Sequence, residues 1–313
     1  GAGLAPEDIA RAARELEERA EGAAGEEKSK LLRQGAQLGK EAQKMREYER
    51  QEQVLGERNS FCATDTDATM MRTKNGELRG GHNLQIGTEN QFVLGWSLSQ
   101  NGNDAASFID HMKRRGEVGL TTTPGCVVAD AWHGSEENYT CLEENGIDSY
   151  VKYRDWFREQ KGKLRPYEKG SFRYDEQRDV YVCPQGKDLA PEAETQEWVA
   201  KSGFVSTVKT YRCAQCASCP VRQACTSAEA RTVQRIERFE GQKARARENL
   251  ASPRGEEPRK RRGWEVETPF GDMKHNMKHA RTRLRGLGKA TADVGLVMIS
   301  WNLRKVWRLE KAA

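Results

Sequence analysis

Three acidic residues have the type and spacing that metal-dependent chemistry on phosphate esters requires. Asp65 follows the apolar start of the run NSFCATDTD, Asp130 ends the apolar run CVVAD, and Glu267 stands in a strongly basic segment. Three carboxylates placed together repel one another unless divalent cations neutralise them, and carboxylate oxygens are good ligands for Mg²⁺. Two such ions, about 3.5–4 Å apart, activate an attacking oxygen and stabilise a leaving one. We therefore expect Asp65, Asp130 and Glu267 to bind two Mg²⁺ or Mn²⁺ ions.

The first of these positions has two candidates. Strand alternation places Asp67 on the same side as Asp65, and Asp65 is preferred because it follows the apolar run directly. Each Asp, taken singly, is also a common turn or helix-cap residue. The combination of both with a Glu in the basic segment favours the metal site over that interpretation.

The basic segment runs from Arg259 to Lys289. It has ten Lys or Arg residues against three acidic ones, whereas the whole chain has a net charge of only +5. Lys274 lies seven residues after Glu267, about two helical turns, so the two side chains share one face of a helix. Clustered cations bind the phosphates of nucleic acid, so the charge pattern favours a nucleic-acid partner over a merely soluble basic surface. The predicted phosphate-binding residues are Lys274, Arg261, Arg262, Lys278, Arg281, Arg283 and Arg285.

Five of the eight cysteines form a second cluster with metal-ligand spacing. Cys213, Cys216, Cys219 and Cys225 are separated by two, two and five residues, and Cys183 precedes a Pro and a nearby Gly. Pairs of that spacing direct two thiolates to one point, as tetrahedral Zn²⁺ requires. A structural Zn²⁺ is the first expectation, and an iron–sulfur cluster or unligated thiols are the alternatives. The remaining cysteines stand singly in apolar surroundings and are expected to be buried thiols. They are Cys62, Cys126 and Cys141.

Alternating strands and helices are expected to position the acidic residues. The predicted strands are 59–67, 82–89, 91–100, 126–130 and 148–152, with a hairpin turn at Asn90. The predicted helices are 105–115, capped by Asp104, and 136–145, capped by Ser135. CVVAD is typical of a buried central strand. If the first and fourth strands are neighbours, Asp65 and Asp130 meet at one end of a sheet, and a helix beside it delivers Glu267.

The chain divides into four predicted parts. Residues 1–58 form a helical arm or linker, 59–153 the first part of a catalytic core, 154–255 an insertion with the zinc candidate, and 256–313 a helical second part with Glu267. Within the insertion we expect a hairpin over 172–183, a strand over 204–212 and a helix near Gln234. An amphipathic helix over 296–309 closes the chain, with its aromatic residues in the core.

The composition excludes a membrane-spanning protein. Charged residues make up 32% and hydrophobic residues 36% of the chain, and no apolar run approaches the roughly 20 residues that a bilayer requires. No signal peptide opens the sequence. We expect a cytoplasmic protein without a membrane partner.

Several runs resemble the DDE transposases of bacterial insertion sequences, particularly the group with a Cys-containing insertion before the catalytic Glu. The runs are ERNSFCATDTDATMMRTK, GGHNLQIGTENQFV, VVADAWHGSEEN, VCPQGKDL, CAQCASCPVRQACT, WEVETPFGDMK, RLRGL and WNLRK. They cover residues 55–310, approximately. The family's TD-x-DA, AD-x-GY and VE-x-x-FG segments, and a Lys seven residues after the Glu, correspond to Asp65, Asp130, Glu267 and Lys274.

The resemblance implies a ribonuclease-H-like mixed sheet flanked by helices. It also implies a bacterial, nucleoid-associated protein whose partner is double-stranded DNA. The implied reaction is cleavage of transposon ends and transfer of the freed 3′-OH into target DNA. A homodimer is implied as well, and residues 4–58 are its candidate interface. Trp132-His133 replaces the family's Gly-Tyr, His82 replaces a Tyr, and the family's N-terminal DNA-binding part has no counterpart in these runs. Two other classes stay open: a metal-dependent nuclease without strand transfer, and a non-catalytic DNA-binding or regulatory protein.

Overall fold

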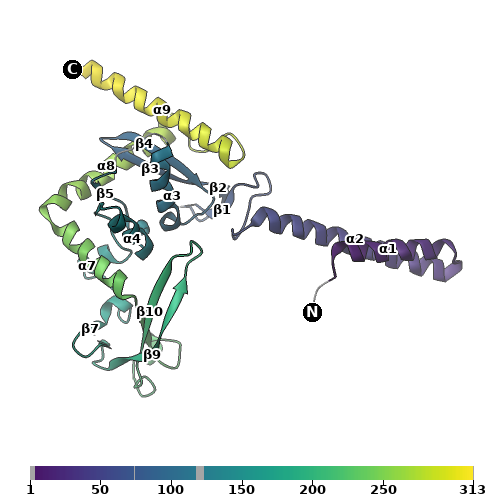
Figure 1. Cartoon of the computed structure of the whole chain (residues 1–313), viewed down its shortest axis with the longest axis horizontal. Helices are drawn as coiled ribbons and strands as arrows, with labels where there is room; N and C mark the ends of the chain where they lie inside the picture. The colour runs from purple at the N-terminus through teal and green to yellow at the C-terminus, as the bar shows by residue number, and fades with distance from the viewer. Residues whose placement is uncertain (1–3, 74, 118–122, 313) are drawn as a thin grey trace. The chain divides into compact units, whose positions relative to one another are not determined.

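The computed structural model describes residues 4–73, 75–117 and 123–312, which form helices and strands of mixed α/β type (Figure 1). The chain divides into two compact units, Gly1–His82 and Asn83–Ala313. No helix in the described ranges is long and apolar enough to cross a membrane.

The N-terminal unit opens with a helical hairpin. Helices α1 (Pro6–Glu21) and α2 (Gly25–Leu55) lie side by side, as Figure 1 shows in purple. Small residues form much of their seam: Ala13 and Ala20 on α1 and Gly35 on α2 are buried. A Cβ at Gly35 would lie 3.2 Å from the Ala13 carbonyl oxygen, so the two backbones approach closely. The predicted pair of charged helices is confirmed.

The predicted strand over residues 59–67 is wrong. The segment forms turns in which the Asp65 amide donates to the Cys62 carbonyl (3.1 Å) and the Ala68 amide to the Asp65 carbonyl (2.9 Å). Short Asp and Thr side chains stabilise turns by bonding nearby backbone, and here the Asp67 amide donates to the Asp65 carboxylate. Strand β1 (Thr69–Arg72) begins after the acidic residues and pairs with β2 (Leu78–Gly81).

The C-terminal unit begins with the predicted hairpin. Strands β3 (Asn83–Glu89) and β4 (Phe92–Ser99) pair through a turn in which Asn90 and Gln91 both have positive φ, as a two-residue hairpin turn requires. Helix α3 (Asp104–Glu117) packs on both strands. Its first turn is capped by Asn103, whose side chain accepts from the Ala105 amide, and not by Asp104 as predicted.

A hydrophobic cluster joins α3 to the elements between residues 126 and 160. Strands β5 (Cys126–Val127) and β6 (Asp148–Ser149) form a short parallel pair, and helix α4 (Glu136–Glu144) starts at the predicted Ser135 cap. The buried central strand predicted over 126–130 is observed only at Cys126–Val127, and Cys126 is exposed. The 3₁₀ turn η1 (Ala131–His133) precedes α4. The short helix α5 (Trp156–Gln160) and the 3₁₀ turn η2 (Lys169–Ser171) follow β6.

Three long helices complete the unit: α7 (Glu237–Ala251), α8 (Pro253–His275) and α9 (Leu287–Ala312). The Asn302 side chain on α9 bonds both the amide and the carbonyl of Val93 on β4, at 2.9 and 2.8 Å. Trp301 is buried beside it, whereas Trp307 is 55% exposed. The predicted closing helix is therefore confirmed, but not every aromatic residue on it lies in the core.

The strands of the described ranges do not hydrogen-bond into one sheet. They form the pairs β1–β2, β3–β4 and β5–β6 and one larger sheet of order β11-β10-β9-β8-β7. The α/β class is confirmed at this level, while the ribonuclease-H-like arrangement stays a prediction.

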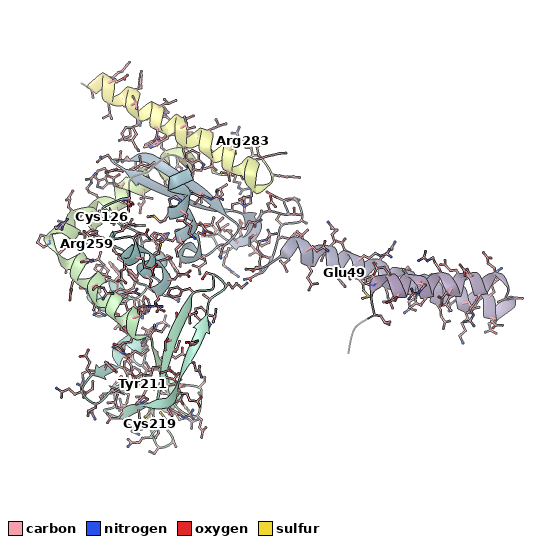
Figure 2. All side chains as sticks on the ribbon, in the orientation of Figure 1. Glu49, Cys126, Tyr211, Cys219, Arg259 and Arg283 are labelled. Atoms are coloured by element: carbon pink, nitrogen blue, oxygen red, sulfur yellow. The ribbon has the colours of Figure 1, made fainter. Side chains whose placement is uncertain are left out.

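The larger sheet forms the cysteine module, which we define as residues 167–235. Its elements are β7 (Arg173–Asp175), β8 (Val180–Val182), β9 (Asp188–Val199), β10 (Val205–Arg212), α6 (Arg222–Cys225) and β11 (Thr232–Arg235). The predicted hairpin and strand are confirmed, and the helix expected near Gln234 starts at Glu237, after β11. Tyr211 and Leu189 are fully buried in the module. Figure 2 labels Tyr211.

Asp179 makes the stability of the module sensitive to acid. It accepts from Lys209, from Tyr211 (2.6 Å) and from Tyr174 (2.7 Å), and these hydrogen bonds lower its pKa to about 2. A carboxylate whose pKa falls on folding stabilises the fold above its unfolded pKa, and this contribution disappears as pH falls through the folded pKa. We expect Asp179→Asn to lower the melting temperature at neutral pH, with the difference from wild type shrinking between about pH 4 and pH 2. Asp188→Asn is the control, and a constant difference across this range would contradict the assignment.

Candidate active site

Asp130 is the acidic residue with the most developed surroundings. It follows β5 at the start of η1, and one of its carboxylate oxygens accepts from the Trp132 amide (3.1 Å) and faces His133 Nδ1 (2.9 Å). Arg262 on α8 donates to the other oxygen at 3.1 Å. The hydrogen bond from His133 is the largest cause that holds the pKa of Asp130 below its ordinary value, and Arg262 adds to it although burial opposes both. Asp130 is therefore an ionised carboxylate held among donors.

More positive charge surrounds this carboxylate than it can neutralise. Burial lowers the pKa of Lys152, and the nearby Arg262 and Arg259 lower it further. Lys152 and Arg259 both lie over the ring of Trp156, at 5.3 and 5.9 Å from its centroid. Like charges gathered in this way are relieved by an anion, so the cluster fits a phosphate group. Arg259 was marked in the sequence only as the start of the basic segment, and Lys152 carried no local signal for this site.

Gly134 fixes η1 against the segment that contains Lys152. The two run together as a parallel bridge between Gly134 and Tyr153. A Cβ at Gly134 would lie 2.2 Å from the Lys152 carbonyl oxygen, so only glycine permits this approach. Asp130 and Lys152 are thereby held at fixed positions relative to each other.

His133 links Asp130 to the β3–β4 hairpin. Its Nε2 lies 3.0 Å from the Gln85 side-chain oxygen, and the Gln85 side-chain nitrogen donates to Asp104 (3.0 Å), which also accepts from Asn83 (2.8 Å). Because Asp104 fixes the orientation of the Gln85 amide, its side-chain oxygen is directed to His133, and the ring is held between Gln85 and Asp130. This network was not predicted, since its members come from separate elements. Through His133, the network fixes the orientation of the Asp130 carboxylate.

Helix α8 carries the third acidic candidate, but on another side from Arg262. Glu267 and Lys274 are exposed, and they share a face as predicted. Glu267 lies five positions after Arg262, which corresponds to a rotation of about 140° around a helix axis. The described structure therefore brings Arg262 to Asp130 and leaves Glu267 at the surface.

The two arginine candidates have different surroundings. Arg261 bonds Glu265 (2.6 Å) and the Asn90 side chain (2.8 Å), and Glu265 accepts from the Gln91 amide (2.6 Å). Arg261 thus fastens α8 to the β3–β4 turn, whereas Arg262 faces Asp130.

The remaining basic candidates lie outside the helix. Helix α8 ends at His275, and the chain then turns back so that His279 bonds Asp293 on α9 at 2.9 Å. Helix α8 therefore carries only the first part of the basic segment. Lys278, Arg281, Arg283 and Arg285 are exposed in the connecting loop.

The first acidic candidates belong to the N-terminal unit. Asp65 and Asp67 are both half-buried, and Asp65 Oδ2 lies 3.7 Å from His82 Nε2. The backbone and the carboxylate of Asp65 stabilise the turns described above.

The five clustered cysteines line one cavity of about 20 Å³, room for one water-sized species. Backbone amides of Lys187 and Arg231 donate to the sulfurs of Cys183 and Cys216, both at 3.3 Å. Cys213 and Cys216 are buried, and burial raises the pKa of Cys213. Figure 2 labels Cys219 at this end of the module. The sequence spacing predicted this convergence. Of the isolated cysteines, Cys62 and Cys141 are half-buried.

Within residues 4–73, 75–117 and 123–312, no three His, Cys, Asp or Glu side chains form a group ready to hold a metal ion. The reason at Asp130 is electrostatic: both oxygens have hydrogen-bond donors instead of carboxylate neighbours. The carboxylate of Asp130 is itself a suitable oxygen ligand for Mg²⁺.

Comparison with known proteins found one relationship. Residues 182–307 match a family described as a transposase DDE domain. The match covers less than half of the chain; it includes most of the cysteine module, α8 with Glu267 and Lys274, and most of α9, and it excludes Asp65 and Asp130. No curated protein and no solved structure gave a significant match. The chain is thus similar to DDE transposases, a family of enzymes that transfer phosphoryl groups on nucleic acid.

Proposed function

We propose that the chain is the catalytic part of a DNA transposase of the bacterial insertion-sequence type, with a ribonuclease-H-like core. One observation carries the proposal: helix α8, inside the segment similar to the transposase DDE domain, contacts the ionised Asp130 through Arg262. A strand-end carboxylate among cations suits a reaction at a DNA phosphate. The cytoplasm of a bacterium, in association with its nucleoid, is the corresponding location.

The reaction has two displacement steps. Water attacks the phosphorus at the transposon end, the P–O3′ bond breaks, and a 3′-OH is released. That hydroxyl then attacks a target phosphorus, forms a new P–O bond and displaces the target's 3′ oxygen. Two Mg²⁺ or Mn²⁺ ions, held by Asp65, Asp130 and Glu267, would neutralise charge on the reacting oxygens.

The basic residues bind and orient the DNA in this scheme. Arg262 and Lys152 hold the phosphate at the reaction site, and the transfer of Arg262 from Asp130 to the phosphate frees a carboxylate oxygen. Lys274 and the loop from Lys278 to Arg285 contact neighbouring phosphates, which adds affinity but no sequence preference.

Nicking of DNA that carries the element's own ends tests the proposal. We expect nicks with Mg²⁺ or Mn²⁺ and none with EDTA, and we expect Asp65→Asn to abolish nicking while Asp67→Asn preserves it. The reverse result for these two variants would make Asp67 the first ligand. Metal-dependent DNA binding without nicking in the wild type would instead support the non-catalytic alternative.

We also propose a structural Zn²⁺ in the cysteine module. Cys183, Cys213, Cys216 and Cys225 pack in one hydrophobic cluster, and amide-to-sulfur hydrogen bonds of the kind that support thiolates are already present. These four are the proposed ligands, and Cys219 is the fifth candidate at the same cavity. Four thiolates fit tetrahedral Zn²⁺.

Metal content and thermal stability test this zinc site. The purified chain should contain one Zn²⁺, and its removal by a chelator should destabilise the module by several kcal/mol. Cys216→Ser should lose the metal, whereas Cys219→Ser and the distant Cys141→Ser should keep it. Iron in place of zinc would support a cluster instead, and absence of both metals would contradict the site.

A homodimer belongs to the same proposal, with the α1–α2 hairpin as the candidate interface. Sedimentation of the full chain over a range of concentrations should give the mass of two chains. A monomer at every concentration would contradict it.

A further inference from the structure

We propose that Trp132 and Arg154 form a stacking platform for one unpaired base of the DNA strand whose phosphate lies beside Asp130. The inference rests on the proposed function, because it needs DNA at this site. It adds the local state of the substrate: one nucleotide at the reaction site is not base-paired.

Trp132 is exposed at a position that the structure fixes. Its side chain is 61% exposed, although a large aromatic residue usually buries most of its surface. Its amide donates to Asp130, and the Gly134 bridge fixes the other end of η1. The backbone of Trp132 is thereby held beside the carboxylate, and the contact of its ring with Arg154 keeps the indole on the same side as the Lys152 segment.

Arg154 stacks on one face of the Trp132 indole and leaves the other face for a planar ligand. Its guanidinium carbon lies 5.5 Å from the Trp132 ring centroid, within the range of a cation–π contact. One face of the ring is covered in this way, and the high exposure leaves the rest accessible. In the described part of the chain no carboxylate pairs with Arg154. A nucleobase can stack on the open face, since every base has a π face.

The cation cluster of Lys152, Arg259 and Arg262 determines where a bound phosphate, and therefore its base, would lie. Lys152 and Arg154 are two residues apart on the segment bridged to Gly134, and Lys152 belongs to the cation cluster with Arg259 and Arg262. A phosphate bound there places its own nucleoside next to Trp132. The bases of a paired duplex are stacked inside the helix, so only an unpaired base reaches the indole.

Three other exposed indoles lack this combination, and one of them, Trp307, lies under Lys311 on α9, away from the cation cluster of Lys152, Arg259 and Arg262. Trp264 lies under Arg261, but that guanidinium is already bonded to Glu265. Trp198 is 60% exposed on β9, next to Glu197, in a strand whose acidic residues repel DNA. Trp132 combines an exposed ring, an Arg without a carboxylate partner and a neighbouring phosphate cluster.

Binding to two matched DNA molecules tests the platform. One is a fully paired duplex with the element's end, and the other has a single unpaired 2-aminopurine at the cleavage position. Wild type should bind the second more tightly and quench its fluorescence by stacking. Trp132→Ala should weaken binding of the second DNA about tenfold and remove the quenching, with duplex binding unchanged. Trp132→Phe should restore most of both signals, and Trp198→Ala should behave as wild type.

The outcomes separate the inference from the function on which it rests. If wild type binds and nicks DNA but Trp132→Ala keeps full quenching and affinity, the platform is overturned and the proposed function stands. If Trp132→Ala and Trp132→Phe lose duplex binding equally, the role of Trp132 is structural and the platform is again overturned. Failure of the wild type to bind either DNA overturns both.

Discussion

Asp130→Asn is expected to reduce metal-dependent DNA cleavage by about a hundredfold to a thousandfold, since stabilisation of the reacting charge contributes several kcal/mol. Asparagine has nearly the same shape and can still accept from the Trp132 amide, so η1 should keep its structure. What disappears is the negative charge that Arg262 and His133 now surround. DNA affinity should change little, because the surrounding cations make the phosphate contacts.

Single-turnover cleavage and equilibrium binding, measured on the same DNA, separate these effects. Asp110→Asn is the matched control, because Asp110 is an exposed carboxylate on α3. It should cleave at the wild-type rate. Wild-type cleavage by Asp130→Asn would show that Asp130 is a turn residue only, and equal loss of binding and cleavage would indicate a structural role.

Gly255→Ala is expected to destabilise the chain by about 3 kcal/mol, at the upper end of the range for overpacking. The residue is buried in the first turn of α8, and its amide donates to the Ser252 cap at 3.1 Å. An added Cβ would lie 2.0 Å from the Asn249 carbonyl oxygen and 2.9 Å from the Tyr150 ring. The nearer atom is backbone, so relief requires a shift of the α7–α8 junction, which positions Arg262.

Gly263→Ala on the same helix provides the opposite expectation. No atom lies within 4 Å of the position that the added methyl group would occupy, and the residue is interior to α8, so alanine should stabilise by up to about 1 kcal/mol. Urea unfolding followed by tryptophan fluorescence measures both variants. A Gly255→Ala protein as stable as wild type would contradict the close packing of this junction.

Local signals in the sequence were sufficient for several elements. The β3–β4 hairpin follows from alternation around Asn90, and α4 follows from Ser135 and the apolar positions after it. These features depend on neighbours within a few residues. The convergence of the cysteines was also predictable, because a two-residue separation restricts where both thiols point. Spacing alone did not show that Cys219 lies outside the hydrophobic cluster of the other four.

The surroundings of the candidate site depended on packing that no local pattern contains. Arg261 and Arg262 are adjacent in the sequence, yet a rotation of about 100° directs one to the β3–β4 turn and the other to Asp130. His133 and Gln85 are 48 positions apart. The expected strand before Asp65 failed for a different reason, since its short polar side chains bond the backbone and stabilise turns.

Strand transfer by the wild-type chain is the most direct test of the central claim that this protein catalyses DNA transposition at Asp130. A labelled DNA with the element's end already cut to a 3′-OH is incubated with unlabelled target DNA and Mg²⁺, and the products are separated by size. Longer labelled strands, formed only with the metal and lost in Asp130→Asn, are the predicted result. Nicked DNA without any joined product, from a chain that binds both DNAs, would contradict transposition and identify a metal-dependent nuclease.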